Sequence, residues 1–300
     1  MTSRILAVTP ARNEARQIGK TIESVLRQSL RPWKYYLVSD GSNDGTDEVM
    51  EEYADMHDFI RYLRREKPGE ELNRVEQVAP GKVGAIEYAL SKAEKESWEY
   101  LAVLDADVVL PGNFYMRLLE EFSKDSKLGI AGCFLRSVLP DGTIAPGGFM
   151  NPDSVGGPVQ MFRRACYEDI GGYKSYGHED CMAVIQAREK GWKVRSFADL
   201  VGNHYVPFEG YSPKIKYKVP ALYKLGKMDF VMYVPFWFVL IQSGVRMLSR
   251  PYMVAGVARF VGYLSGVITR PERIPPQRNW LNRQKMYIET ILGKLKRILG

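Results

Sequence analysis

The feature that most constrains the fold is an alternation of two patterns over the first two hundred residues. Short apolar runs at residues 5–8, 35–38 and 100–104 have the length and composition of buried strands. Between them lie stretches in which apolar residues recur at helical spacing, such as Ile18, Ile22 and Val25, and residues 82–95. Strands that alternate with helices in this way predict βαβ units built around a largely parallel sheet, and therefore an α/β fold.

Acidic turns follow two of these predicted strands. The run 35–38 leads into Asp40, and the run 100–104 leads into the triplet Asp105-Ala106-Asp107. Ligands of open α/β sheets bind outside the carboxyl ends of the strands, which is where both turns fall. Because alternate side chains of an extended segment point the same way, Asp105 and Asp107 are expected to share one side. Two adjacent carboxylates repel each other unless a cation lies between them, and such oxygen ligands suit Mg²⁺ or Mn²⁺.

Two further segments could contribute to the same edge. Asp40 is expected to contact a ligand, because a carboxylate at a strand end needs a partner, whereas Asp44 is expected to cap the helix that starts near Thr46. The pair Gly81-Lys82 opens the helix 82–95, and a helix N-terminus with a nearby ammonium group suits a diphosphate.

Glu179, Asp180 and His204 each admit two interpretations. Acidic residues in the first turn of a helix complement the helix dipole, so Glu179 and Asp180 are either capping residues or a candidate general base. His204 is one of three histidines. It is either a structural side chain or the third member of an Asp/Asp/His metal site.

In order along the chain, these segments resemble the family 2 glycosyltransferases, whose nucleotide-sugar-binding fold is called GT-A. The resemblance rests on residues 9–14, 38–46, 105–107 and 156–164, and on Glu179-Asp180 followed by Arg188 and Gly191. It covers residues 3–204, with Glu87 standing where the family often has asparagine.

The resemblance implies a role for each candidate residue. The nucleoside would be held by five residues, of which Asp40 reads the base: Pro10, Ala11, Arg12, Glu14 and Asp40. Asp105 and Asp107 would hold the ribose and the metal–diphosphate, with His204 as a possible third metal ligand. Asp180 would deprotonate the acceptor, with Glu179 as a close second, and Gly157 would line the acceptor side.

The distribution of charge divides the chain near residue 210. Residues 1–210 carry a net charge of −6, whereas residues 211–300 contain 16 basic and 3 acidic side chains, a net of +13. Apolar runs at 230–241 and 252–268, and a basic amphipathic helix from about residue 280, predict helices that lie on an anionic membrane. A helical subdomain with a solvated basic face is the alternative. Nucleic acid is not expected, because few aromatic residues alternate with the basic ones.

These observations predict a two-part protein: a GT-A domain over residues 1–210 and a basic, apolar helical region over residues 211–300. The expected activity is an inverting, metal-dependent transfer from a UDP- or GDP-sugar to a hydroxyl of a lipid-linked or surface glycan. The alternatives are transfer to polyprenyl phosphate, as in dolichyl-phosphate mannose synthases, or a non-catalytic nucleotide-binding module recruited to the membrane. Three scattered cysteines and the lack of an apolar leader in residues 1–16 predict a cytoplasmic protein at the inner membrane face.

Overall fold

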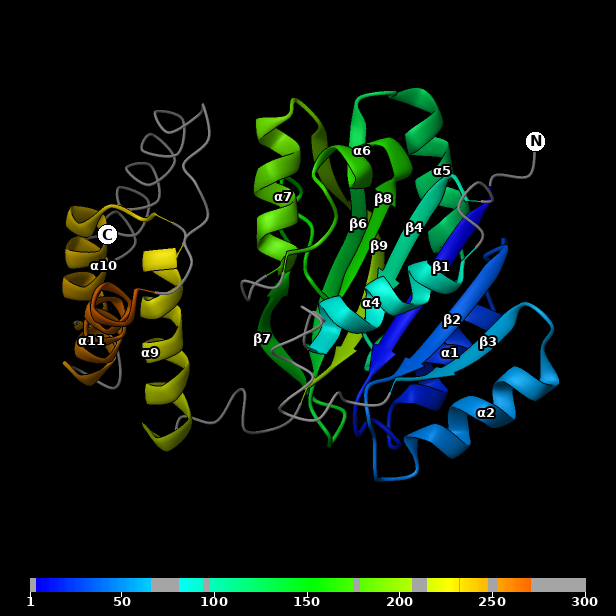
Figure 1. Ribbon diagram of the computed structural model, residues 1–300, viewed down its shortest axis with the longest axis horizontal. Helices are drawn as coiled ribbons and strands as arrows, with labels where there is room; N and C mark the ends of the chain where they lie inside the picture. The colour runs from blue at the N-terminus through cyan, green and yellow to red at the C-terminus, as the bar shows by residue number, and fades with distance from the viewer. Residues whose placement is uncertain are drawn as a thin grey trace. The chain divides into compact units, whose positions relative to one another are not determined.

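The computed structural model describes residues 4–65, 81–93, 98–174, 179–206, 215–231, 233–247 and 253–270. The chain separates into two compact units, Met1–Pro207 and Phe208–Gly300, and each is described here by itself. The elements of both units can be followed in Figure 1.

The first unit is built on a nine-stranded sheet in the order β3-β2-β1-β4-β8-β6-β9-β5, with β7 paired to β6. One half is parallel throughout and contains β3 (Ile60–Arg64), β2 (Lys34–Ser39), β1 (Ile5–Ala11) and β4 (Tyr100–Leu104). The other half is mixed and contains β8 (Val159–Arg163), β6 (Leu128–Val138), β9 (Lys193–Tyr205), β5 (Val108–Val109) and β7 (Ile144–Phe149).

The α/β class predicted from the sequence is confirmed. The predicted parallel arrangement is found in the half of the sheet that contains the three apolar runs, β1, β2 and β4. Within the mixed half, the antiparallel pairing of β6 with β7 follows from the short connection between them. Five residues join β6 to β7, with the Leu139 amide bonded to the Thr143 carbonyl, and a connection this short joins only antiparallel strands.

Helices pack on both faces of this sheet, and β1 is therefore buried on both sides. Ile5 and Ala7 belong to a core with α1 (Ile18–Leu26), α2 (Thr46–Met56) and α5 (Phe114–Lys124). Leu6 and Val8 belong to a second core with α4 (Gly81–Lys92), α6 (Arg164–Asp169) and α7 (Glu179–Glu189). A strand buried on both faces needs a continuous apolar run, which explains the composition of residues 5–8.

Strand register brings the acidic turns to one edge of the sheet. Ala11 lies opposite Ser39, and the Asp40 amide donates to the Ala11 carbonyl at 2.9 Å, so the ends of β1 and β2 coincide. β4 runs parallel to β1 on its other side. At the same edge β5 pairs with the end of β9, with Val108 opposite His204. Residues nearly a hundred positions apart in the sequence therefore meet at this edge.

The second unit contains α9 (Ile215–Val231), α10 (Phe236–Met247) and α11 (Val254–Thr269). α9 and α11 approach closely at Gly226 and Gly262. A side chain at either position would collide with the backbone of the other helix. Arg259, in the middle of the apolar α11, forms a buried two-pronged ion pair with Asp229, at 2.7 and 3.0 Å. None of the helices described in either unit has the length and apolar composition needed to cross a bilayer. The helix predicted from residue 280 lies outside the described residues.

Candidate functional site

A cavity of about 340 Å³ opens at the carboxyl ends of β1, β2 and β4. The residues that line it are Pro10, Ala11, Arg12, Glu14, Asp40, Gly81, Lys82, Ala85, Asp105, Ala106 and Asp107. The structure thus brings together every residue that the sequence predicted for the nucleotide side of the site. These residues come from three separate strand ends and the start of α4, so their convergence is a property of the fold.

Asp40 does have a partner, as a carboxylate at a strand end requires, and it is one that the sequence reasoning missed. The Arg65 Nη1 atom lies 2.8 Å from Asp40 Oδ1, and both side chains are less than a tenth exposed. Arg65 directly follows β3, and its amide donates to the Ser39 carbonyl of the adjacent strand. The sequence signal for this ion pair was a basic residue, Arg65, placed directly after a strand that neighbours β2. The ion pair holds the Asp40 carboxylate in one position at the cavity wall.

Lys82 links Asp105, which lines the cavity, to the backbone of Gly157. From the first turn of α4, its ammonium group donates to Asp105 Oδ1 and, at 2.9 Å, to the carbonyl oxygen of Gly157. Burial alone would lower the pKa of Lys82, but the charge and hydrogen bond of Asp105, with further help from Asp180 and Glu179, raise it above its ordinary value. The side chain is therefore a fixed cation between the aspartate triplet and Gly157.

Asp180 reaches the same place from the first turn of α7. Its carboxylate lies directly against the Cα atom of Gly157, because a Cβ atom there would come within 2.0 Å of Asp180 Oδ2. Gln160, in β8, donates to the Asp180 backbone carbonyl at 3.3 Å and so ties the helix start to the sheet. The predicted acceptor-side residue and the predicted base are thus in contact. His178, which precedes this turn, lies outside the described residues.

The far side of the triplet carries uncompensated negative charge. His204 Nε2 lies 3.3 Å from Asp107 Oδ2, and the buried Nδ1 atom of His204 has no hydrogen-bond partner in the structure. Burial, followed by the charges of Asp107, Asp105 and Asp44, raises the pKa of Glu14 to about 7. A cation bound among these carboxylates would offset their mutual repulsion.

Among the described residues, however, no three His, Cys, Asp or Glu side chains converge closely enough to hold a metal ion by themselves. Asp107 and His204 provide two adjacent ligands. Magnesium-type sites commonly use one or two protein ligands and complete the set with substrate phosphates and water. The donor set therefore fits a divalent cation that is shared with a bound diphosphate.

Hydrogen bonds between two loops shape the nucleotide side. Asn13 has a left-handed backbone with φ 58°, and its side-chain oxygen accepts the Asn43 amide at 3.0 Å. The Glu14 amide donates to Thr46 Oγ1 at 2.8 Å. Asp44 accepts the Thr46 amide at 3.1 Å, which confirms that it binds the start of α2, although the N-cap position itself is occupied by Gly45.

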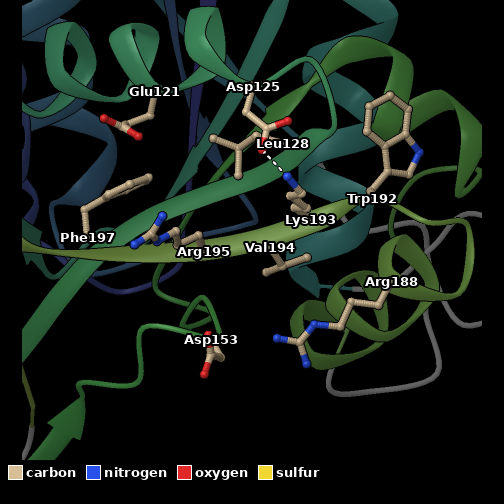
Figure 2. Close-up of a pocket in the computed structure, with 10 residues that line it drawn as sticks. All are labelled: Glu121, Asp125, Leu128, Asp153, Arg188, Trp192, Lys193, Val194, Arg195 and Phe197. Carbon is tan, nitrogen blue, oxygen red and sulfur yellow. Dashed lines mark hydrogen bonds and ion pairs between the residues drawn. The ribbon is translucent and has the colours of Figure 1, made fainter. Parts of the chain in front are cut away.

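Two further cavities are lined by described residues of this unit. One of about 620 Å³ shares Glu14 and Asp107 with the nucleotide cavity and extends the site toward Tyr205. The other, of about 380 Å³, is lined by residues around the start of β9, including the ion pair of Lys193 with Asp125 at 2.7 Å (Figure 2). It contains none of the predicted site residues. It begins at the opposite end of β9 from His204, which at about 3.3 Å per residue is on the order of 30 Å away.

Comparison with known proteins agrees with this geometry. The sequence profile described as Glycosyl transferase family 2 matches residues 6–171. A poly-beta-1,6-N-acetyl-D-glucosamine synthase of Staphylococcus epidermidis is 25% identical over 210 residues, covering 62% of this chain and 44% of its own length. The synthase of Staphylococcus aureus strain COL is 23% identical, covering 61% of this chain and 45% of its own length. The chain thus spans less than half the length of these relatives.

Solved structures share the fold at low sequence identity. The mannosyltransferase PcManGT of Pyrobaculum calidifontis, in complex with GDP-Man and Mn²⁺, has a TM-score of 0.60 and 14% identity, over 90% of this chain and 89% of its own. GalNAc-T7 with UDP, GalNAc and Mn²⁺ has a TM-score of 0.59 and 16% identity, over 92% of this chain and 59% of its own. S. aureus TarS 1-349 with UDP has a TM-score of 0.53 and 17% identity, over 88% and 92%. The predicted GT-A fold is confirmed.

Proposed function

The chain belongs to glycosyl transferase family 2, and we propose that it is an inverting, metal-dependent enzyme that moves a sugar from a UDP- or GDP-sugar to an acceptor hydroxyl. One observation carries the proposal. Lys82 links the nucleotide cavity, through Asp105, to the Gly157–Asp180 contact, so a donor pocket and a candidate base adjoin.

In this proposal the nucleoside lies in the cavity along residues 10–14, with Pro10, Ala11 and Arg12 against the base and ribose. Asp40, fixed by Arg65, accepts a hydrogen bond from the base. Asp105 binds the ribose hydroxyls. Lys82 offers positive charge beside the diphosphate, which a helix N-terminus also favours.

Asp107 and His204 would hold a Mg²⁺ or Mn²⁺ ion, whose positive charge would favour the ionised form of the neighbouring Glu14. Such an ion neutralises the diphosphate and stabilises it as a leaving group. The PcManGT and GalNAc-T7 structures were both obtained with Mn²⁺, which supports a divalent cation here.

Asp180 is the proposed general base. It takes the proton from the acceptor hydroxyl as the oxygen attacks the anomeric carbon from the face opposite the diphosphate. A single displacement of this kind inverts the anomeric centre. Its carboxylate is held against Gly157, where the absence of a side chain makes room for it, and Glu179 on the same helical turn is the second candidate.

The proposed acceptor is a hydroxyl of a surface or lipid-linked glycan, and the polysaccharide synthases among the relatives support this class. Transfer to polyprenyl phosphate is the alternative, and it needs no strong base. A membrane-recruited module that binds nucleotides without transfer is the non-enzymatic alternative.

A donor panel tests the activity. With UDP-, GDP- and dTDP-sugars we expect release of nucleoside diphosphate from a UDP- or GDP-sugar when Mn²⁺ or Mg²⁺ is present, and loss of that release in EDTA. Nucleoside diphosphate is measured in a coupled assay, with reactions that lack the enzyme as the blank. Metal-dependent nucleotide binding without any transfer or hydrolysis would instead support the non-catalytic alternative.

We further propose that the second unit binds an anionic membrane, which would place the enzyme at the cytoplasmic face. Apolar side chains on α10 and α11 remain at least 38% exposed and recur every three or four residues: Phe236, Trp237, Leu240, Ile241, Val254, Val257, Val261, Leu264, Val267 and Ile268. Soluble monomers rarely expose apolar patches of this extent. The net charge of +13 over residues 211–300 complements an anionic surface, as in helices that lie in the membrane interface.

Vesicle flotation tests this surface. The double variant Trp237→Glu/Leu240→Glu is expected to reduce binding to phosphatidylserine vesicles at least tenfold, because two exposed apolar anchors become charges. The matched control is Met56→Glu, which changes a side chain of the first unit that is 56% exposed and leaves α10 intact. Equal recovery of the wild type and the double variant with the vesicles would contradict the proposal.

A further inference from the structure

Phe149, the last residue of β7, lies at the border of the candidate site. Its ring rests on Gly156, where a Cβ atom would come within 2.5 Å of Phe149 Cγ. On another side, the centroid of the ring lies 6.2 Å from that of the His204 imidazole, with the two planes tilted by 44°. Despite these two contacts the side chain remains 42% exposed. One part of the ring is packed and another part faces solvent.

The two contacts place Phe149 between the two functional sides of the site. Gly156 is followed directly by Gly157, against which the Asp180 carboxylate lies, and consecutive Cα atoms are about 3.8 Å apart. His204 is the neighbour of Asp107. The exposed aromatic ring therefore borders both the proposed base and the proposed cation ligands.

We propose that Phe149 is a stacking platform for a pyranose ring of the acceptor. This inference rests on the proposed function and specifies its acceptor. A pyranose ring presents C–H groups on its faces, which form an apolar surface that an aromatic ring covers well, whereas its hydroxyl groups point outward at the rim. Phe149 would thereby orient the sugar so that one of its hydroxyl groups reaches Asp180.

Packing inside the first unit does not account for this side chain. The core residues around it are almost fully buried: Leu135, its partner across the β6–β7 pairing, is 0% exposed. A phenylalanine that only filled the space above Gly156 would be expected to share this burial. A large apolar ring that stays open beside polar catalytic groups instead suits a ligand with both apolar and polar surface.

Saturation-transfer NMR tests the platform without requiring turnover. The probes are the methyl β-pyranosides of glucose, galactose and N-acetylglucosamine, added to the full chain with diamagnetic Mg²⁺ and UDP or GDP. For at least one of them we expect saturation of the ring C–H protons in the wild type and in Phe149→Tyr, which keeps an aromatic ring. In Phe149→Ala we expect affinity to fall about three- to tenfold, the usual scale for one aromatic contact.

Met150→Ala is the matched control, since Met150 is the next residue and is 47% exposed. It is expected to leave pyranoside affinity unchanged. Saturation of the nucleotide protons in the same samples measures nucleotide binding to the donor cavity. If the wild type bound no nucleotide, the result would contradict the proposed function itself. Nucleotide binding without pyranoside binding in the wild type, or unchanged pyranoside binding in a folded Phe149→Ala, would overturn the platform alone.

Discussion

Replacement of Asp180 by asparagine is expected to lower kcat by about two to four orders of magnitude, the range that a general base contributes. Asparagine keeps the size of the side chain that lies against Gly157, so the packing of the site is preserved. It cannot accept a proton from the acceptor hydroxyl. Donor affinity should change little, because Asp180 does not line the nucleotide cavity. The measurements are single-turnover transfer and, separately, nucleotide binding.

Glu179→Gln is the matched control for Asp180→Asn, since it removes the adjacent carboxylate in the same helical turn. It is expected to retain most of the activity. If Glu179→Gln were inactive and Asp180→Asn active, the two assignments would have to be exchanged. Near-normal transfer in both variants would contradict a carboxylate base and favour a phosphate acceptor, which attacks without losing a proton.

The parallel half of the fold and the nucleotide side of the site were predictable for one physical reason. In parallel strands the carboxyl ends lie at a common edge, so an apolar run followed by an acidic turn specifies both a strand and the position of its turn. Asp40 and Asp105 were placed correctly in this way. The start of α4 at Gly81 was equally accessible, because its helical spacing begins at that point.

The acceptor side and the mixed half of the sheet were not accessible by the same reasoning. The position of β8 between β4 and β6 depends on pairings between distant segments, which no local pattern encodes. The Arg65–Asp40 ion pair likewise joins residues that follow two neighbouring strands and lie 25 positions apart in the sequence. In the second unit Arg259 stood out in an apolar run, but its partner Asp229 is thirty residues away on another helix.

The structure also separates the roles of the two triplet aspartates more clearly than their spacing does. Asp105 is already paired with the ammonium group of Lys82, so its negative charge is largely matched. Among the described residues, the imidazole of His204 is the one basic side chain beside Asp107, and Asp107 is the strongest charge acting on Glu14. On this basis we propose Asp107 as the firmer cation ligand and Asp105 as the residue that binds the ribose.

This division predicts different outcomes for two conservative substitutions. Asp107→Asn is expected to lower kcat/KM by about two to three orders of magnitude, because the leaving diphosphate loses charge stabilisation. The Mn²⁺ concentration that gives half-maximal activity should rise at least about tenfold. Asp105→Asn should instead raise the KM for the donor. It should also lower the free energy of unfolding by about 1–3 kcal/mol, since the partly buried Lys82 loses its charged partner.

Titration of activity with Mn²⁺ at several donor concentrations separates the two effects, and urea denaturation measures stability. Asp44→Asn serves as a control for general loss of negative charge near Glu14, because the Asp44 carboxylate is engaged by the Thr46 and Ala15 amides. It should leave the Mn²⁺ requirement unchanged. If Asp105→Asn shifted the Mn²⁺ requirement and Asp107→Asn did not, the assignment of the two aspartates would be reversed. If neither substitution shifted it, the cation would have to be held elsewhere, and the pairing of Asp107 with His204 would be structural.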